Sequence, residues 1–407
     1  MAYIEENPRG VDKAEIVVAI PTFNEASNIR NLVVAVDRGL KQFYGDRESV
    51  IINCDNHSLD GTRETFLGTE TETPKIYIST APGEKGKGRN IRNLFDKARL
   101  LDPQVIVILE ADIRNIAPRW IYCFVEPVLR GAGFVTPLYA SHKYEDTMEA
   151  LLLYPLLRSL YGRRLRRPIA GECAFGKNLL DVFTTSTDQW TEPMLEDGID
   201  IWMAVTATAT RVPVCQTVMG SRKIHRFKDP YSQINRAFTN TVGVFFDLMT
   251  TFQDRWTKIK WSKPTILFNA DALEMEGPVP VEINTPRLFE LFARGVERYH
   301  PLLEGILNKP ELHKIEEIKS MGFENFSFPS HTWANTLFDV AVAYRDAEKE
   351  QKQDILNALL LLYYGKVVSF VKKTERMSTQ QAEEIIDREC MTFEENKRYL
   401  VTKWKSV

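Results

Sequence analysis

The sequence predicts an α/β protein with a mostly parallel sheet, followed by a mainly helical C-terminal region. Four β-rich runs occupy residues 14–20, 49–55, 74–80 and 105–112. Amphipathic helical patterns separate the first two runs, at residues 28–43, and the last two, at residues 88–101. Strands that alternate with helices form parallel sheets, and such sheets bind ligands at the carboxyl ends of their strands.

The pattern changes after the fourth run. Helical segments are predicted at residues 149–167 and 196–210, and a β-like stretch at residues 212–220. After Tyr231 the sequence is mainly helical, apart from an irregular proline-containing passage. We therefore predict an α/β domain over residues 1–230 and a mainly α-helical domain over residues 231–407.

The composition excludes several classes of protein. The chain has 407 residues, of which 44% are hydrophobic and 26% charged, and a net charge of -3, which argues against a nucleic-acid partner. Its 5 cysteines are scattered without a CxxC motif, which fits a reducing compartment and argues against a zinc site. The polar N-terminus is unlike a signal peptide, and the apolar runs are shorter than a membrane span of about 20 residues. We expect a soluble, cytoplasmic protein with no integral membrane segment, whose helical region could form a homodimer contact.

Polar segments follow all four predicted strands, at residues 21–25, 55–62, 82–90 and 110–115. Because parallel strands end at one edge of a sheet, we expect these segments to form a single site. The first two also contain the residue types that favour helix caps and turns, so a purely structural role stays open for them.

Two carboxylates, Glu110 and Asp112, follow the fourth run with only Ala111 between them. Such a pair alternates between the faces of a strand but can converge where the chain turns. Converging carboxylates suit Mg²⁺ or Mn²⁺, especially a cation that also holds a diphosphate. The alternative is that both residues cap a following helix.

The segment at residues 82–90 reads "PGEKGKGRN" and opens a predicted helix. Its glycines allow close backbone approach, and a helix N-terminus attracts anions. Lys85, Lys87 and Arg89 add positive charge suited to phosphates. The segment matches neither GxGxxG nor a Walker loop, and a solvated turn is the alternative.

Two further groups have both a functional and a structural interpretation. His225 lies in the basic stretch at residues 221–230, where cationic neighbours favour the neutral imidazole that a metal needs. It could equally be a surface histidine. The arginine-rich run from Arg163 to Arg167 could clamp a small anionic acceptor or form a solvated helix end.

The order of these segments is specific. A strand followed by "PTFNE", then "DNHSLDGT", a Gly-Lys-Gly loop and a strand ending in "EAD" resembles a GT-A nucleotide-sugar glycosyltransferase, whose Rossmann-like sheet is mostly parallel. The segments "EADIRNIAPRW", "RPIAGE", "EDGIDIWM" and "KIHRF" resemble the retaining enzymes that make mannosylglycerate, a compatible solute, and glucosyl-3-phosphoglycerate. The resemblance covers residues 14–235, with a general likeness in the helical part.

This resemblance implies a metal-dependent hexosyltransferase. Its donor would be a nucleoside-diphosphate sugar, and its acceptor a small anionic hydroxy acid such as glycerate or 3-phosphoglycerate. The sugar would be transferred with retention, through same-face attack in which the leaving phosphate accepts the proton.

The resemblance also implies roles for individual residues. Those matching donor-binding positions are Pro21, Thr22, Asn24 and Glu25 for the nucleoside, Asp55 for the base, Lys85 and Lys87 for the base or diphosphate, and Glu110, Ala111 and Gly171 for the remainder of the donor. Asp112 and His225 match the family's ligands for the metal, which is Mg²⁺ or Mn²⁺. Glu172 lines the sugar pocket, and Asp200 lies beside the sugar and the acceptor hydroxyl.

One position departs from the family. Its members usually have aspartate where this chain has Glu110, whose additional methylene would let it reach the ribose or a metal-bound water. Two rival functions stay open. One is an inverting GT-A enzyme that acts on a polyprenyl phosphate, since "PTFNEASNI" also resembles that class. The other is a non-catalytic nucleotide-sugar-binding protein in which Glu110 marks a degenerate metal site.

Overall fold

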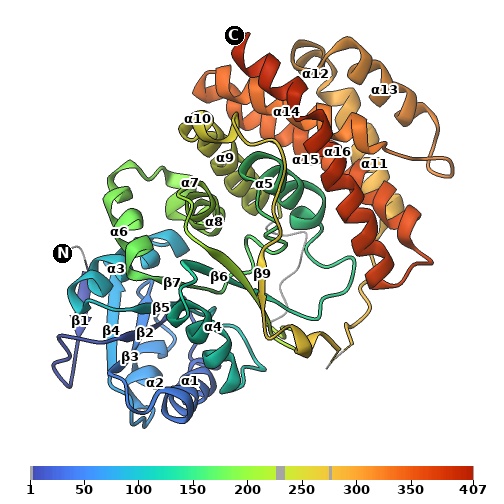
Figure 1. Ribbon diagram of the computed structural model, residues 1–407. Helices are drawn as coiled ribbons and strands as arrows, with labels where there is room; N and C mark the ends of the chain where they lie inside the picture. The colour runs from blue at the N-terminus through green and yellow to red at the C-terminus, as the bar shows by residue number, and fades with distance from the viewer. Residues whose placement is uncertain (1–2, 226–233, 275–276, 407) are drawn as a thin grey trace. The chain divides into compact units, whose positions relative to one another are not determined.

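The computed structural model describes residues 3–225, 234–274 and 277–406 (Figure 1). The chain forms two compact units. The α/β unit comprises residues 1–141, 167–229 and 265–278, and the helical unit comprises residues 142–166, 230–264 and 279–407. A single boundary at residue 230 does not describe this division, because each unit also takes a segment from beyond it. Residues 226–230 of the predicted basic stretch lie outside the described residues.

The described part of the α/β unit holds a 9-stranded sheet of order β1-β4-β3-β2-β5-β7-β6-β8-β9. Its strands are β1 (Tyr3–Glu6), β2 (Ile16–Thr22), β3 (Ser49–Asp55), β4 (Lys75–Thr80), β5 (Val105–Ile108), β6 (Phe134–Leu138), β7 (Cys173–Gly176), β8 (Val214–Val218) and β9 (Ile266–Phe268). β2 to β5 pair in parallel, as do β6, β8 and β9, while β1 and β7 pair antiparallel with their neighbours. The predicted mostly parallel α/β sheet is confirmed. The sequence did not reveal β1, β6, β7 and β9, which are short runs without a clear period.

Helices cover both faces of this sheet (Figure 1). They are α1 (Ile29–Tyr44), α2 (Thr62–Gly68), α3 (Lys87–Leu101), α4 (Arg119–Leu129), α6 (Lys177–Thr185), η2 (Thr187–Gln189), α7 (Glu192–Leu195), α8 (Ile199–Ala209) and η3 (Ala270–Glu274). On β2, Ile16, Val18 and Ile20 share one core with α1 and α4. The intervening residues point to the opposite face, where α3 packs. Burial on both faces explains why β2 is apolar without alternation.

The strand register aligns the carboxyl ends of the central strands. Thr22 at the end of β2 lies opposite Asp55 at the end of β3, and Asp55 lies opposite Ser79 in β4. β5 ends at Ile108, so the "EAD" acids occupy the turn beyond it rather than the strand. The polar segments that follow these strands therefore begin at one edge of the sheet.

The helical unit is built from η1 (Glu149–Leu153), α5 (Tyr154–Tyr161), α9 (Ile234–Thr251), α10 (Gln253–Trp256), α11 (Thr285–Arg298), α12 (His300–Ile306), α13 (Lys309–Ser320), α14 (Ser330–Asp346), α15 (Lys349–Thr374) and α16 (Thr379–Lys405). The predicted helical C-terminal region is confirmed. The helix predicted at residues 149–167 is shorter, because Gly162 adopts a left-handed φ of 69° that ends α5. The arginine-rich run is consequently not helical.

Three buried basic side chains have polar partners within the helical unit. Arg158, with a side chain only 1% exposed, pairs with Glu394 at 2.9 Å. Lys366 pairs with Glu389 at 2.9 Å. Lys397 donates to the backbone oxygens of Ser159 and Ile259 at 2.8 and 2.7 Å. Each buried charge thus has the partners that offset its loss of hydration.

One described helix, α15, is long and apolar enough to cross a membrane by length and composition. Of its most apolar stretch, 78% is buried inside the protein, as in the core helix of a helical bundle. All 5 cysteines are free and buried.

The contact between α1 and α4 allows a test of packing. A Cβ added at Gly39 would lie 2.6 Å from both the Pro118 oxygen and Ile121 Cγ1. We expect Gly39→Ala to lower the free energy of unfolding by about 1–3 kcal/mol, because the two helices must separate. Gly68→Ala, where a Cβ meets nothing within 4 Å, is the matched control and should be neutral or slightly stabilising. Urea denaturation measures both variants, and equal stabilities would contradict this account.

Candidate functional site

A cavity of about 350 Å³ opens at the carboxyl edge of β2, β3 and β5. The residues on its wall that the sequence pointed to are Pro21, Thr22, Glu25, Lys85, Lys87, Glu110, Ala111 and Asp112. Gly86, one of the glycines of "PGEKGKGRN", also lines it. Phe23, Asn56, Asn90 and Asp197 line it as well, although the sequence pattern did not point to them. Three of the polar segments that follow the strands thus meet around one space, and Asn56 brings in the fourth.

Asp55 supports this cavity from inside the protein. It is 0% exposed and does not line the cavity. Its Oδ1 accepts hydrogen bonds from the hydroxyls of Thr22 and Ser58 at 2.6 and 2.7 Å, and its Oδ2 from Tyr77 OH and the Ser58 amide at 2.9 and 2.6 Å. Ser58 Oγ in turn accepts from the amide of Asn24 at 2.7 Å. Asp55 therefore ties the end of β2 to the loop after β3, a role that differs from the expected contact with a base.

The Gly-Lys-Gly loop is shaped by the protein's own backbone. A Cβ at Gly86 would lie 2.2 Å from the oxygen of Leu195, and one at Gly88 only 2.0 Å from the oxygen of Met194. The Gly88 amide donates to the oxygen of Glu196 at 3.2 Å. The two glycines are thus required by the approach of α7, and this contact places the N-terminus of α3 at the cavity.

An aromatic side chain and a cation lie at the rim. Phe23 is 39% exposed, which is unusual for a large apolar residue, and it lines the cavity. The Lys85 ammonium lies 4.6 Å from the centre of its ring. This arrangement offers a flat aromatic surface and a positive charge to a ligand.

The turn after β5 is held by two asparagines. Asn28 donates to the oxygens of Ala111 and Ile113 at 2.5 and 2.9 Å. Asn115 donates to the oxygen of Arg222 at 2.7 Å and accepts from the amide of Ile224 at 2.8 Å. These contacts fix residues 222–225 beside the turn, so that Lys223 reaches Glu110.

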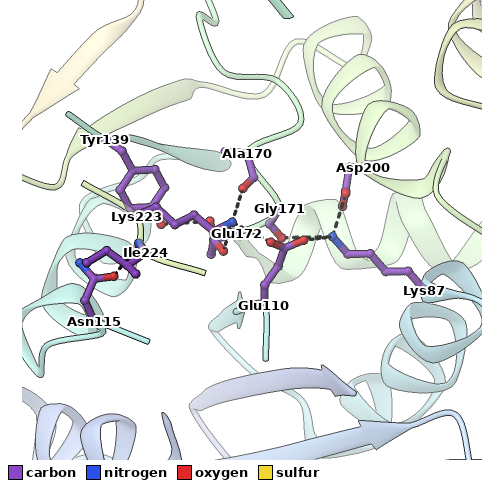
Figure 2. Close-up of polar contacts among 10 residues, drawn as sticks. All are labelled: Lys87, Glu110, Asn115, Tyr139, Ala170, Gly171, Glu172, Asp200, Lys223 and Ile224. Atoms are coloured by element: carbon purple, nitrogen blue, oxygen red, sulfur yellow. Dashed lines mark hydrogen bonds and ion pairs between the residues drawn. The ribbon is translucent and has the colours of Figure 1, made fainter. Parts of the chain in front are cut away.

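A chain of ion pairs extends inward from the cavity (Figure 2). Lys87 lies between two carboxylates, with its Nζ 2.7 Å from Asp200 Oδ2 and 3.2 Å from Glu110 Oε1. The other oxygen of Glu110, Oε2, lies 2.6 Å from Lys223 Nζ. Glu110 thus bridges two ammonium groups, and its expected contact with the ribose or a metal-bound water stays a prediction.

Lys223 continues the chain to Glu172. Its Nζ lies 2.8 Å from Glu172 Oε1 and donates to the oxygen of Ala170 at 3.0 Å. Tyr139 OH donates to Glu172 Oε2 at 2.9 Å. The sequence-predicted residues Lys87, Glu172 and Asp200 are therefore joined through Lys223, which was noted only as a cation beside His225.

The environment shifts the pKa values of this chain. Burial raises the pKa of the Glu172 and Asp200 carboxyls, although the neighbouring lysines oppose the shift. Burial by itself lowers the pKa of an ammonium, but the adjacent carboxylates outweigh it, and the pKa values of Lys87 and Lys223 lie above their usual range. Both lysines are therefore charged at neutral pH.

Gly171 completes the enclosure of Glu110. Its φ is 93°, and an added Cβ would lie 2.4 Å from the carboxyl carbon of Glu110. Any other residue would combine backbone strain with a collision. The glycine of "PIAGE" therefore makes room for the glutamate.

The two predicted metal ligands come from neighbouring segments. Asp112 is 5% exposed and lines the cavity. His225 is exposed, and its backbone forms an antiparallel bridge with Ile113. Within residues 3–225, 234–274 and 277–406, no group of three or more His, Cys, Asp or Glu side chains could hold a metal by itself.

The arginine-rich run is divided between the units. Arg166, in the helical unit, makes a forked ion pair with Glu383, at 2.9 Å from Nε and 2.8 Å from Nη2. Arg167, in the α/β unit, donates to Ser141 Oγ at 2.9 Å. The proposed clamp for an acceptor stays a prediction, and Arg166 has a structural partner.

Comparison with known proteins bears on the α/β unit. Residues 17–180 match the family model described as glycosyl transferase family 2. The match covers 164 of the 407 residues and shows what this segment is similar to. The matched residues include the strands from β2 to β7 and most of the cavity wall, and the match confirms the GT-A fold expected from the motifs. No curated protein sequence matches the chain.

Three solved structures with distant similarity to this chain are of mycobacterial proteins. Glucosyl-3-phosphoglycerate synthase from Mycobacterium tuberculosis, in complex with Mn²⁺, UDP and glucosyl-3-phosphoglycerate, is 19% identical with a TM-score of 0.45. The similarity covers 59% of this chain and 80% of that one. The same enzyme with Mn²⁺, UDP-glucose and glycerol 3-phosphate gives the same values. A structure described only as a mycobacterial protein is 19% identical with a TM-score of 0.43, over 59% of this chain and 75% of that one.

The position of Asp55 leads to a prediction. Asp55→Asn replaces one acceptor oxygen by an amide donor, so at least two of the groups that donate to it lose their acceptor. We expect the free energy of unfolding to fall by about 1–3 kcal/mol in urea denaturation. Asp181→Asn, at an exposed position of α6, should leave it unchanged. Unchanged stability with lost nucleotide affinity would instead indicate a direct contact between Asp55 and a base.

Proposed function

We propose that this chain is a metal-dependent, retaining hexosyltransferase that uses a nucleoside-diphosphate sugar and a small anionic hydroxy acid. One observation carries the proposal: within a segment that matches the glycosyl transferase family 2 model, Lys87 lines the cavity and also pairs with Asp200 and Glu110. A single cation thus connects the space for a diphosphate with two carboxylates expected near the donor.

The nucleoside end of the donor fits the rim of the cavity. The exposed ring of Phe23 offers a surface for stacking, with Lys85 at 4.6 Å from its centre. Pro21, Thr22 and Glu25 line the same wall. We assign the base and ribose to this part of the site.

The diphosphate and a divalent cation fit the wall between α3 and the turn after β5. The N-terminus of a helix of 15 residues and the charged Lys87 favour anions there. Asp112 and His225 supply an oxygen and a nitrogen donor from adjacent segments. Mg²⁺ commonly takes one or two carboxylates and completes its shell with substrate phosphates and water, so this small donor set fits a cation shared with the substrate. When bound, the cation would stabilise the charge that develops on the leaving diphosphate.

The chain's own residues would then act on the sugar and the acceptor. Lys87 adds positive charge beside the leaving group. Asp200 would orient the acceptor hydroxyl, and Glu172, held by Lys223 and Tyr139, would contact the sugar. Same-face attack requires no protein nucleophile, because the leaving phosphate oxygen takes the proton of the acceptor hydroxyl.

The deciding experiment is a transfer assay with product analysis. The purified chain is incubated with UDP-, GDP- or ADP-hexoses and Mn²⁺, with glycerate or 3-phosphoglycerate as acceptor. An α-linked product from an α-linked donor, identified by NMR, supports the proposal. A parallel assay uses a polyprenyl phosphate as acceptor, and a β-linked product there would establish the inverting alternative. Tight donor binding with neither transfer nor hydrolysis would indicate a non-catalytic binding protein.

Asp112 should be essential for metal-dependent turnover. Asp112→Asn preserves size but removes the charge that a cation requires, so kcat should fall by about two orders of magnitude or more. Mn²⁺ affinity in the presence of nucleoside diphosphate, measured by calorimetry, should fall in parallel. Asp188→Asn, whose side chain is 95% exposed, is the control and should behave as wild type. Normal activity of Asp112→Asn at limiting Mn²⁺ would remove Asp112 from the metal site.

His225 should contribute to metal-dependent activity, because an imidazole nitrogen is a common ligand of divalent cations. His225→Ala should lose most metal-dependent turnover and remain folded, since the side chain is exposed. His313→Ala, at an exposed position of α13, is the control. Unchanged Mn²⁺ affinity in His225→Ala would show that the residue has no role at the metal.

A further inference from the structure

We propose that Lys223 and Glu110 are a positioning pair for glycosyl transfer, which hold Glu172 and Lys87 in place on the sugar side of the site. This inference rests on the proposed function and adds a role for Lys223. It also gives a physical reason for glutamate at position 110. Figure 2 shows Glu110 reaching Lys87 with one oxygen and Lys223 with the other.

Lys223 is engaged by the protein rather than by the cavity. Its ammonium group donates hydrogen bonds to Glu110 at 2.6 Å and to the oxygen of Ala170 at 3.0 Å. It also forms an ion pair with Glu172 Oε1 at 2.8 Å. The side chain is only 13% exposed, and Lys223 does not line the cavity. It must therefore act on a substrate through the carboxylates that it holds.

Glu110 needs its full length for this bridge. Its carboxyl group lies over Gly171, where even a Cβ would come within 2.4 Å of the carboxyl carbon. From that place its two oxygens reach ammonium groups on α3 and on the segment at residues 222–225. An aspartate is one methylene shorter and would withdraw from Gly171 and from at least one lysine. Glu110, Gly171 and Lys223 are thus mutually dependent.

Loss of the Lys223–Glu110 pair should affect the binding of the sugar more than that of the nucleotide. Without Lys223, Glu110 and Glu172 would face each other as like charges, and one of them would have to move or take up a proton. Glu172 is 1% exposed, and of the contacts described above it would keep only the hydrogen bond from Tyr139. Phe23 and Lys85, which we assign to the nucleoside, have no contact with this chain of ion pairs in the described contacts. Loss of the pair should therefore separate sugar positioning from nucleotide binding.

The test compares Lys223→Met with Glu110→Asp. Lys223→Met removes the ammonium at nearly constant length, and Glu110→Asp retains the charge and shortens the bridge without leaving a cation or anion in excess. Lys177→Met, a lysine paired with Asp102 at an exposed position of the same unit, is the matched control and should retain wild-type kinetics. For each variant we would measure kcat, the KM of the sugar donor, and the affinities for UDP and UDP-glucose, or for the GDP pair if that donor is used.

We expect kcat to fall roughly 100-fold in Lys223→Met, because small misplacement of reacting groups has effects of that size. The kcat of Glu110→Asp should fall at least about tenfold by the same reasoning. UDP affinity should change less than threefold in both. The variants should also lose the difference in affinity between UDP-glucose and UDP, since that difference reports contacts with the sugar.

Parallel loss of UDP affinity and kcat in both variants would overturn the inference, because it would show a general structural role. Wild-type kcat in either variant would overturn it as well. Failure of the proposed function has a different signature: a wild-type chain that binds UDP-glucose but transfers no sugar. In that case a selective loss of UDP-glucose affinity in Lys223→Met would still support the positioning pair, and unchanged affinity would overturn it.

Discussion

The need to neutralise three clustered carboxylates organises this site. Glu110, Glu172 and Asp200 come from the turn after β5, the segment before β7 and the start of α8. The Glu172 side chain is buried, and those of Asp200 and Glu110 are 17% and 27% exposed. Without cations these acids would repel one another in partly dehydrated surroundings, and Lys87 and Lys223 offset that cost. Because each lysine contacts two of the acids, the pairs form one continuous chain. The segments that carry these residues are therefore held in register by charge as well as by the sheet.

The remaining features of the α/β unit keep that chain next to an open cavity. Asp55 ties the end of β2 to the loop after β3 through buried hydrogen bonds. Gly86 and Gly88 let α7 approach the start of α3, which brings Lys87 to the cavity wall. Lys87 thus has two roles: it neutralises carboxylates, and it lines the cavity. Such an arrangement suits a reaction in which negative charge develops on a leaving group and must be stabilised without reorganisation.

The position of Glu110 shows what a family pattern leaves unspecified about one residue. A glutamate in place of the usual aspartate suggests a longer reach toward the ribose or a metal-bound water, which stays a prediction. In the structure the longer side chain also reaches Lys87 and Lys223. Lys223 was visible in "KIHRF" beside His225, but nothing in the sequence indicates that Asn115 and Ile224 hydrogen-bond and so place it against Glu110. Asp55 was similarly recognisable as a polar strand end, while its burial depends on donors from three segments.

The α/β class, the helical C-terminal region and the edge of the sheet where polar residues gather could all be predicted from the sequence. Those features follow from local periodicity and from the rule that parallel strands end together, which depend on residues near one another in the chain. The division into units, the supporting role of Asp55 and the pairing of Lys223 with Glu110 and Glu172 became evident only in the folded chain. These depend on contacts between residues far apart in the chain, such as Lys87 with Asp200. Which residue pairs with such a charge depends on the tertiary fold, and the local sequence pattern does not indicate it.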